Sequence, residues 1–308
     1  MLKLVKSAKN PIITPRQDKV WEVDGTFNPG AIAWNGSIHL LYRAADHNGV
    51  SRLGYAQSIN GVDLNFRSPD PVMEPSALWE EFGCEDPRIT SLDGGFYVTY
   101  TAYSRAGPRI ALASTKDFTK FEKYGLVGPD RDDKDFVLFP EKIGSRIAIL
   151  HRLESNVQIA YFDSIRTLTA SQKFWNDYAK RFEEHEVLRS RYPWEERKMG
   201  VGPPPIKTSR GWLVLYHGVS MQKVYRAGAV LLDLDDPRKV LARTSAPILE
   251  PEMEFEKNGV VSNVVFPEGA IIRDNELIVY YGGGDRVCCV ASAPAEEFLD
   301  ELEKSSDR

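Results

Sequence analysis

Residues 31–44 read AIAWNGSIHLLYRA, an apolar alternating segment that contains a turn and ends on a polar residue. The same pattern recurs at intervals of roughly 50–67 residues, the scale of propeller and solenoid repeats. The further copies are RITSLDGGFYVTYTAY (88–103), FPEKIGSRIAILHR (139–152), PPPIKTSRGWLVLYHG (203–218) and GAIIRDNELIVYYGGGD (269–285). These repeats predict an all-β fold, a five-bladed β-propeller around one central pocket.

Each copy carries a turn near its middle. The predicted turn centres are Asn35-Gly36, Asp93-Gly94, Ile143-Gly144, Arg210-Gly211 and Asp274-Asn275. A further strand and hairpin follow most copies, as in RLGYAQSINGVDLNF at 52–66, which supplies enough strands for a four-stranded blade. The polar residues at the strand ends are expected to converge on the central pocket: Arg43, Tyr103, Arg152, His217 and Asp285.

The composition is that of an ordinary soluble globular protein, with 42% hydrophobic and 27% charged residues. Because no linker-like stretch divides the chain, we expect one domain over residues 1–308. A net charge of -5 and a pI of about 5.7 argue against nucleic acid as a partner. No apolar run approaches the roughly 18 residues of a membrane span, and no signal peptide is recognisable. The expected location is cytoplasmic, away from membranes.

The three cysteines do not form a recognisable metal site or disulfide framework. Cys288 and Cys289 are adjacent and would point to opposite faces of a strand, so we expect both to be reduced packing residues. Cys84 stands beside an acidic motif and is interpreted as a small buried apolar residue, with a place in the pocket wall as the alternative. The sequence predicts no bound metal.

Three segments fall outside the repeats. The chain opens with a segment up to about Asp24, in which NPIITP at 10–15 is a predicted strand that closes the ring. Residues 171–200 form an insertion, interpreted either as a short helix or loop at the pocket mouth or as a solvated outer segment. Its aromatic residues are compatible with self-association into a homo-oligomer. Residues 293–308 predict a C-terminal helical tail that docks through Phe298, Leu299 and Leu302.

An acidic motif, Glu85-Asp86-Pro87-Arg88, opens the second copy. Pro87 is expected to hold Asp86 in an extended conformation and so to fix the direction of its carboxylate. A lone motif of this kind is more often a capped turn with an ion pair. Its place at the edge of the predicted pocket instead favours Asp86 as a general acid.

A second group is cationic and comes from the third and fourth copies. It comprises Lys134, Arg152, Lys198 and His217. Cations brought together in an acidic protein repel one another unless an anion offsets them, which points to phosphate. The alternative is that each one pairs with a nearby acid, such as Asp135 or Glu154.

A third group comes from the first and last copies, which become neighbours when a ring closes. Asn28, Arg43 and Asp285 carry side chains that hydrogen-bond hydroxyl groups, as a sugar requires. Aromatic residues are available as pocket walls, although most are expected to pack inside blades: Trp34, Tyr103, Tyr216, Tyr225, Tyr280 and Tyr281. The GGGD run at 282–285 opens no helix and is not a dinucleotide-binding fingerprint.

Taken together, these residues resemble the β-mannoside phosphorylases of glycoside hydrolase family 130, which are five-bladed β-propellers. The resemblance runs through nearly the whole chain. Seven stretches carry it. They are FNPGA, which contains Asn28; LYRA, with Arg43; EDPRI, with Asp86; LFPEK followed by LHR, which ends at Arg152; KMGVGPPPIKT, which starts at Lys198; YHG, with His217; and YYGGGD, which ends at Asp285.

The resemblance implies a role for each group. Asp86 would be the sole proton donor, while Asn28, Arg43 and Asp285, with Tyr103, would hold the mannosyl unit. Arg152, Lys198 and His217, with Lys134 matched less securely, would bind phosphate. The implied reaction is reversible phosphorolysis with inversion, giving α-mannose 1-phosphate, with inorganic phosphate as co-substrate and no other cofactor.

Two other functions remain open at this point. A β-mannosidase on the same fold would need a carboxylate that activates water, for which Glu141 and Glu268 are the candidates. A sugar-binding propeller without catalysis is the other. The linkage, β-1,4 or β-1,2, and the acceptor sugar are left undecided, and loops such as 47–51, 104–108 and 175–196 would set them.

Overall fold

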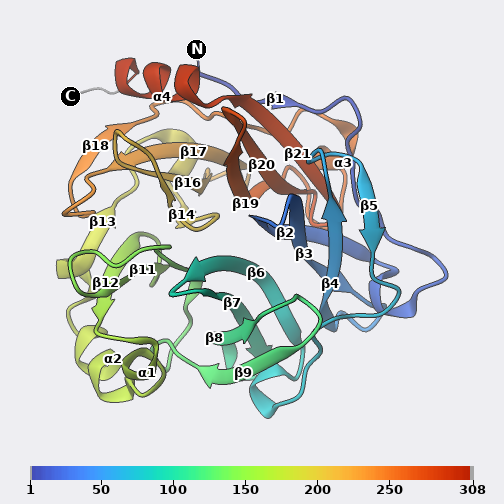
Figure 1. The fold of residues 1–308 in the computed structure, drawn as a ribbon, viewed down its shortest axis with the longest axis horizontal. Coiled ribbons are helices and arrows are strands. Elements are labelled where there is room, and N and C mark those ends of the chain that lie inside the picture. Colours follow the sequence, from blue (N-terminus) through green and yellow to red (C-terminus); the bar gives the residue numbers. More distant parts are fainter. Residues whose placement is uncertain (1, 306–308) are drawn as a thin grey trace.

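The computed structural model describes residues 2–305, in which β strands dominate. Within this range the strands form four hydrogen-bonded sheets. Figure 1 shows the sheets arranged about the middle of the molecule, with the chain passing from one to the next around it. The predicted all-β class is confirmed. None of the helices in residues 2–305 has the length and apolar character needed to cross a membrane.

The largest sheet has eight strands and consists of two antiparallel groups. The first group contains β2 (Gly25–Trp34), β3 (Ser37–Ala45), β4 (Ser51–Ser58) and β5 (Leu64–Arg67). The second contains β6 (Gly83–Leu92), β7 (Gly95–Ser104), β8 (Gly107–Thr115) and β9 (Phe121–Leu126). A parallel pairing of Ser51 with Gly83 links the two groups.

The remaining sheets are also antiparallel. One contains β10 (Lys134–Leu138), β11 (Ile147–Arg152), β12 (Val157–Phe162) and β13 (Glu186–Leu188). The next contains β14 (Lys198–Val201), β15 (Ile206–Lys207), β16 (Trp212–Val219), β17 (Tyr225–Leu232) and β18 (Val240–Arg243). The last contains β19 (Val265–Arg273), β20 (Glu276–Gly283), β21 (Val287–Pro294) and the N-terminal β1 (Val5–Lys6).

The predicted hairpins are present. Asn35-Gly36 and Asp93-Gly94 join β2 to β3 and β6 to β7, and all four residues have positive φ. Two positive φ angles are what a two-residue type I′ turn requires, and Asn-Gly and Asp-Gly adopt them readily. Asp274-Asn275 does the same between β19 and β20. These turns fix the register of each hairpin, and with it the face on which every side chain lies.

The apolar core is divided into layers, each shared by strands of neighbouring groups. Leu215 of β16 packs with Val279 of β20, for example, and Tyr42 of β3 packs with Tyr280 of β20. Sheets that pack face to face bury alternate side chains of each strand between them. The residues at the ends of each strand lie outside this packing, so they can be polar.

Helices are short and lie outside the strands. They are α1 (Ile165–Thr169), α2 (Gln172–Tyr178), α3 (Glu254–Lys257) and α4 (Ala295–Lys304), with 3-10 turns at Val20–Glu22, Leu78–Glu80, Phe182–His185 and Pro193–Glu195. The 171–200 insertion contains a short helix, α2, as the first interpretation predicts, but α2 lies at the outside of the molecule, as the second predicts, with Trp175 and Tyr178 buried against the β10–β13 sheet. Figure 1 shows α1 and α2 at the periphery.

The N-terminal segment joins the last sheet through different residues from those predicted. Val5–Lys6 pairs with β21, whereas NPIITP contributes an isolated bridge between Ile13 and Cys288. The predicted strand at NPIITP is therefore wrong, because its two prolines lack the N–H groups that a ladder needs. The predicted C-terminal helix is confirmed as α4, which buries Phe298, Leu299 and Leu302 beside Leu4. Residues 306–308 of the predicted tail lie outside the described residues.

A β-bulge interrupts the first strand of four groups. The pairing register shifts at Asn28 in β2, Asp86 in β6, Asp135 in β10 and Glu268 in β19. Asn28, Asp86 and Asp135 have φ of 49°, 51° and 58°, so the expectation that Pro87 holds Asp86 extended is wrong. Asn and Asp tolerate the left-handed region better than most residues, and a bulge re-aims the side chain it carries.

Candidate active site

Asp86 lies at the centre of a buried polar cluster and is 6% exposed. Its Oδ1 accepts a hydrogen bond of 2.9 Å from Asn28 Nδ2 and one of 3.4 Å from Arg43 Nη1. Arg43 also donates to Glu85 Oε1 at 2.6 Å and to Ser51 Oγ at 2.9 Å. The bulges of β2 and β6 thus place the predicted acid against two predicted sugar-binding residues.

The surroundings of Asp86 favour its ionised form. Burial alone would raise the pKa of this carboxyl group, but Arg43 and Lys134 and the hydrogen bond from Asn28 lower the pKa below its ordinary value. The free protein therefore holds Asp86 as a carboxylate. A bound anion close by would offset the cations and raise the pKa of Asp86, which prepares it to carry a proton when substrate is present.

Asp285 follows β20 and faces the same cluster. Burial raises the pKa of Asp285 to about 6, although the charge of Arg43 acts in the opposite direction. Its backbone φ is 50°, as for the bulge residues. Asn28, Arg43 and Asp285 are therefore brought together, as the sequence predicts.

The predicted cations lie on the other side of the cluster. Lys134, Arg152 and Lys198 line one cavity of about 580 Å³. Burial and the nearby charge of Arg152 lower the pKa of Lys198 to about 8. Lys134 Nζ lies 4.0 Å from Glu85 Oε2, so it stands between the cavity and the acid. Arg131 and three carboxyl groups, Asp132, Asp133 and Glu154, line the cavity as well. Arg152 is paired with Asp135, as in the alternative interpretation, whereas Lys134 and Lys198 provide further positive charge that would attract an anion.

His217 is buried beneath this cavity, with its ring 4.4 Å from that of Phe266. Burial lowers the pKa of His217 to about 3, so the imidazole is neutral at pH 7. Its Nδ1 has no hydrogen-bond partner among the described residues. His217 thus adds no positive charge to the group of predicted cations, although it remains able to donate or accept one hydrogen bond.

Arg88 is the residue that the sequence reasoning undervalued. It is 1% exposed, and its Nη2 donates to Asp135 Oδ1 at 3.0 Å and to Glu268 Oε2 at 3.1 Å. Burial raises the pKa of Glu268 well above its ordinary value, although the charge of Arg88 acts in the opposite direction. The sequence carried no local signal for this role of Arg88, because its side-chain partners lie 47 and 180 positions away in the chain.

The predicted aromatic residues differ in their surroundings. Tyr103 is 39% exposed at the end of β7 and packs against Phe82. Of the predicted aromatic walls, Tyr216, Tyr280 and Tyr281 are fully buried in the cores. Tyr225, by contrast, lies under Lys198 Nζ at 5.4 Å from its ring centre.

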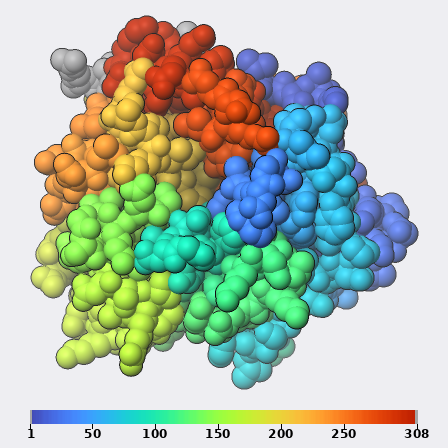
Figure 2. All heavy atoms as spheres, in the orientation of Figure 1, coloured from blue at the N-terminus to red at the C-terminus, as the bar shows by residue number. Residues whose placement is uncertain are grey.

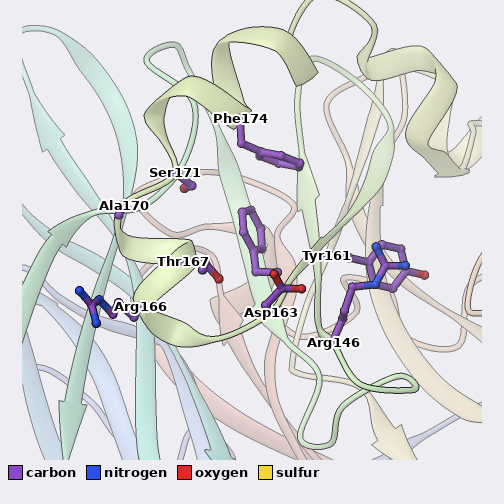
Figure 3. A pocket seen from close by; sticks show the side chains of 9 residues that line it. Arg146, Tyr161, Asp163, Arg166, Thr167, Ala170, Ser171 and Phe174 are labelled. Atoms are coloured by element: carbon purple, nitrogen blue, oxygen red, sulfur yellow. The ribbon is translucent and has the colours of Figure 1, made fainter.

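A second hollow of about 430 Å³ lies beside α1 and α2. Figure 3 shows its lining, which includes Arg146, Tyr161, Asp163 and Phe174. The predicted site residues are not part of it. Figure 2 shows that segments distant in sequence meet around the middle of the face seen in Figure 1. Several groups of strands contribute residues to the cluster around Asp86, which is therefore the candidate active site.

Comparisons with known proteins agree with this assignment. A family model described as beta-1,4-mannooligosaccharide phosphorylase matches residues 4–304. A 1,2-beta-oligomannan phosphorylase of Thermoanaerobacter sp. (strain X514) is 41% identical over 94% of this chain and 97% of its own. A beta-1,2-mannobiose phosphorylase of the same organism is 35% identical over 96% and 99%.

The fold has a matching counterpart among solved structures. The beta-1,2-mannobiose phosphorylase of Listeria innocua, in complex with beta-1,2-mannobiose, superposes with a TM-score of 0.84 at 29% identity, covering 98% of this chain and 99% of that one. An all-β scaffold with a cluster of buried carboxyl groups and a neighbouring cavity that Lys134, Arg152 and Lys198 line, together with these likenesses, defines a carbohydrate-active enzyme. The chain belongs to glycoside hydrolase family 130, as the motifs in its sequence indicate.

Proposed function

We propose that this protein is an inverting β-mannoside phosphorylase. The observation that carries the proposal is the Asp86 carboxylate, whose pKa Arg43 and Lys134 lower, together with a cavity that the same Lys134 lines with Arg152 and Lys198. Phosphate is itself a nucleophile, so it needs cationic guidance and no second carboxylate. An inverting hydrolase would instead need a carboxylate about 6.5–9.5 Å from the acid to activate water.

In the proposed reaction a phosphate oxygen attacks the anomeric carbon of a terminal β-mannosyl unit. The bond between that carbon and the glycosidic oxygen breaks, and the proton that Asp86 carries passes to the departing oxygen, directly or through a mannose hydroxyl. The products are α-mannose 1-phosphate and the shortened acceptor, and Asp86 is left as the carboxylate found in the free protein. General acid catalysis of this kind contributes typically 10²–10⁴-fold.

Each group of residues has a proposed role in binding. Asn28, Arg43 and Asp285 hold the mannosyl hydroxyls, with Tyr103 at the edge. Lys134, Arg152 and Lys198 bind phosphate, and His217 contributes a hydrogen bond as a neutral imidazole. Inorganic phosphate is the proposed co-substrate, with no other cofactor, and a cytoplasmic location remains a prediction.

We also propose that the strands form one domain, a five-bladed propeller. The eight-stranded sheet supports this, because its two four-stranded halves meet at the single pairing of Ser51 with Gly83. Counting those halves separately gives five groups, each of about four strands. The convergence of four bulges on one cluster is what a ring with inward-facing first strands would produce.

For the linkage we propose β-1,2. Two relatives at 41% and 35% identity carry names with this linkage, and so does the matching solved complex. The family description names the β-1,4 linkage instead, so a direct comparison of the two is part of the test. The acceptor is then mannose or a short β-1,2-mannan.

A β-mannosidase is less well supported by the candidate bases. Glu268 accepts a hydrogen bond from Arg88 and burial raises its pKa, and Glu141 is paired with Lys207 at the surface. A general base must be ionised and within reach of the attacking water. Burial opposes the ionised form of Glu268, and the presence of Lys134, Arg152 and Lys198 in one cavity favours phosphate over water.

The test is a pair of incubations, with β-1,2-mannobiose and with β-1,4-mannobiose, each with and without inorganic phosphate. We expect α-mannose 1-phosphate in proportion to consumed β-1,2-mannobiose, and almost no reaction when phosphate is absent. Synthesis from α-mannose 1-phosphate and mannose provides the reverse check. Rapid release of mannose without phosphate would overturn the phosphorylase, and preference for the β-1,4 substrate would overturn the linkage alone.

A further inference from the structure

Asp135 is a buried carboxylate, and each of its two oxygens accepts a hydrogen bond from one arginine. Oδ2 accepts a hydrogen bond of 2.6 Å from Arg152 Nε, and Oδ1 accepts one of 3.0 Å from Arg88 Nη2. The residue is 2% exposed and takes its place at the bulge of β10 with φ of 58°. Because it lies beneath the cavity wall, Asp135 is not placed to bind a ligand itself.

The pairing leaves one end of Arg152 available. Its Nε is bound to Asp135 and its Nη1 donates to the main-chain oxygen of Glu154 at 3.0 Å. Nη2 has no hydrogen-bond partner among residues 2–305. Arg152 lines the cavity together with Lys134 and Lys198. Two fixed nitrogens therefore hold the guanidinium plane and leave its remaining donors for the cavity.

We propose that Asp135 is a positioning residue for phosphate, acting through Arg152. The proposal rests on the function proposed above and assigns a part to a residue that the motifs leave out. The Asp135 carboxylate fixes the orientation of the Arg152 guanidinium. Its negative charge also offsets the mutual repulsion of Arg152 and Lys198, which share the cavity. Removing the charge should weaken phosphate binding in particular.

The surrounding backbone is shaped to admit this carboxylate. A Cβ atom on Gly200 of β14 would lie 2.1 Å from Asp135 Oδ2 and 2.7 Å from His217 Cε1. Contacts below 3.0 Å force a displacement, so only glycine fits between Asp135 and His217. This explains the glycine two positions after Lys198, and it provides a second way to disturb Asp135 without changing its chemistry.

Arg88 connects Asp135 to the acid. The same guanidinium that binds Asp135 donates from Nη1 to the main-chain oxygen of Asp86 at 3.3 Å and from Nε to that of Gly202 at 2.8 Å. The proposed proton donor and the proposed phosphate ligand Arg152 are thus held by one continuous buried network. A network of this kind is tested by double-mutant cycles.

The experiment measures the Michaelis constants for phosphate and for β-1,2-mannobiose in the full-length Asp135→Asn and Gly200→Ala proteins. Asn keeps the size of Asp and tolerates positive φ. Its amide nitrogen is a donor, however, so it cannot accept the hydrogen bond from one of the two arginines. We expect the constant for phosphate to rise roughly 10- to 100-fold, the usual effect of removing a group behind a ligand. The constant for the mannoside should change little.

Glu80→Gln is the matched control. Glu80 is also fully buried and is paired with Lys123 at 2.8 Å and with Tyr100 at 2.6 Å, but it lies outside the candidate site. It should lower the melting temperature without changing the ratio of the two Michaelis constants. Asp135→Asn is also introduced into the Arg152→Ala protein, where it should have almost no further effect on the constant for phosphate, because Arg152 is no longer there to be positioned.

The outcomes separate this inference from the proposed function. Equal changes in both Michaelis constants, or additive effects of Asp135→Asn and Arg152→Ala, would overturn the positioning role of Asp135. If Asp135→Asn is too unstable to assay, Gly200→Ala decides, since unchanged phosphate kinetics in that variant would equally overturn it. A wild-type enzyme that turns over without phosphate would overturn the proposed function as well.

Discussion

The side-chain amide of Asn28 donates a hydrogen bond of 2.9 Å to Asp86 across 58 positions of sequence. Both residues stand at β-bulges with φ close to 50°, in the first strands of two neighbouring groups. Asn28 Oδ1 is buried and has no hydrogen-bond partner among the described residues. Repetition of one local distortion therefore brings the proposed acid and a proposed sugar-binding residue together.

Asp86→Asn tests the acid directly. Asn preserves the size of the side chain and tolerates φ of 51°, but it has no proton to donate. We expect turnover to fall by about 10²–10⁴-fold while phosphate affinity is retained. Steady-state kinetics and a melting curve check this. A loss of stability in proportion to the loss of activity would indicate a structural ion pair instead.

Arg152→Ala and Lys198→Ala test the phosphate site. Each removes a charge-assisted contact, commonly worth about 1.5–3 kcal/mol, so the Michaelis constant for phosphate should rise about 10- to 100-fold. The constant for the mannoside should change much less, because Asn28, Arg43 and Asp285 are untouched. Similar increases for both substrates would mean that the pocket as a whole is disturbed.

Lys198 predicts the alkaline limit of activity. Its pKa of about 8 means that it loses its charge as the pH rises through 8, which removes one cation from the cavity. We expect kcat/KM for phosphate, which reports groups of the free enzyme, to decline above that pH. Lys198→Arg keeps a charge at all accessible pH values and should move the decline upward. An unchanged pH profile in Lys198→Arg would mean that another group causes the alkaline decline of kcat/KM.

Asp285→Asn tests whether the buried, ionised carboxylate of Asp285 lowers the stability of the folded protein. The folded-state pKa of about 6 exceeds the ordinary value of 3.8, so the folded protein retains the proton longer than the unfolded chain. Stability from this group is present below about pH 4 and is lost as the pH rises through 6. At pH 7.5 the Asn variant should be as stable as the wild type or more so, by on the order of 1–3 kcal/mol, while binding mannosides less well. Denaturation curves at pH 4 and 7.5 check the sign, and a larger advantage at pH 4 would contradict it.

Glu268→Gln distinguishes the phosphorylase from a hydrolase. Burial raises the pKa of Glu268 and so favours its neutral form, and its side chain accepts a hydrogen bond from Arg88, so the neutral amide should preserve the fold and most of the phosphorolytic activity. An enzyme that used Glu268 as its base would lose mannoside cleavage almost completely. Activity with and without phosphate in this variant decides between the two.

Much of the fold could be predicted because its signals are local. The turns at Asn35-Gly36 and Asp274-Asn275 need positive φ, which these residue pairs adopt readily, and alternating apolar residues beside them specify strands. The strand predicted at NPIITP failed because long-range pairing with β21 selected Val5–Lys6 instead. Two prolines in that stretch remove donors that the ladder requires.

The site residues likewise fall into those that short motifs indicate and those that they do not. Asp86, Arg152 and Lys198 could be identified from the sequence because each lies in a distinctive short motif. Asp135 and Glu268 could be named only as an ion-pair partner and a candidate base, since an acid beside a lysine or after a proline is common and carries no local mark of burial. Both are buried, but Arg152, His217 and Arg88 lower the pKa of Asp135, whereas burial raises that of Glu268.

The sequence by itself determined the repeat of strands, the hairpin turns and the family, and it indicated the proposed acid and most of the proposed cations, because these depend on residue type and short spacing. Only the tertiary structure decided the left-handed backbone at Asp86, the neutral state of His217 and the buried pairing of Asp135 with Arg88 and Arg152. The physical reason is that backbone register, desolvation and charge partners depend on which segments are packed together, and no local pattern records this.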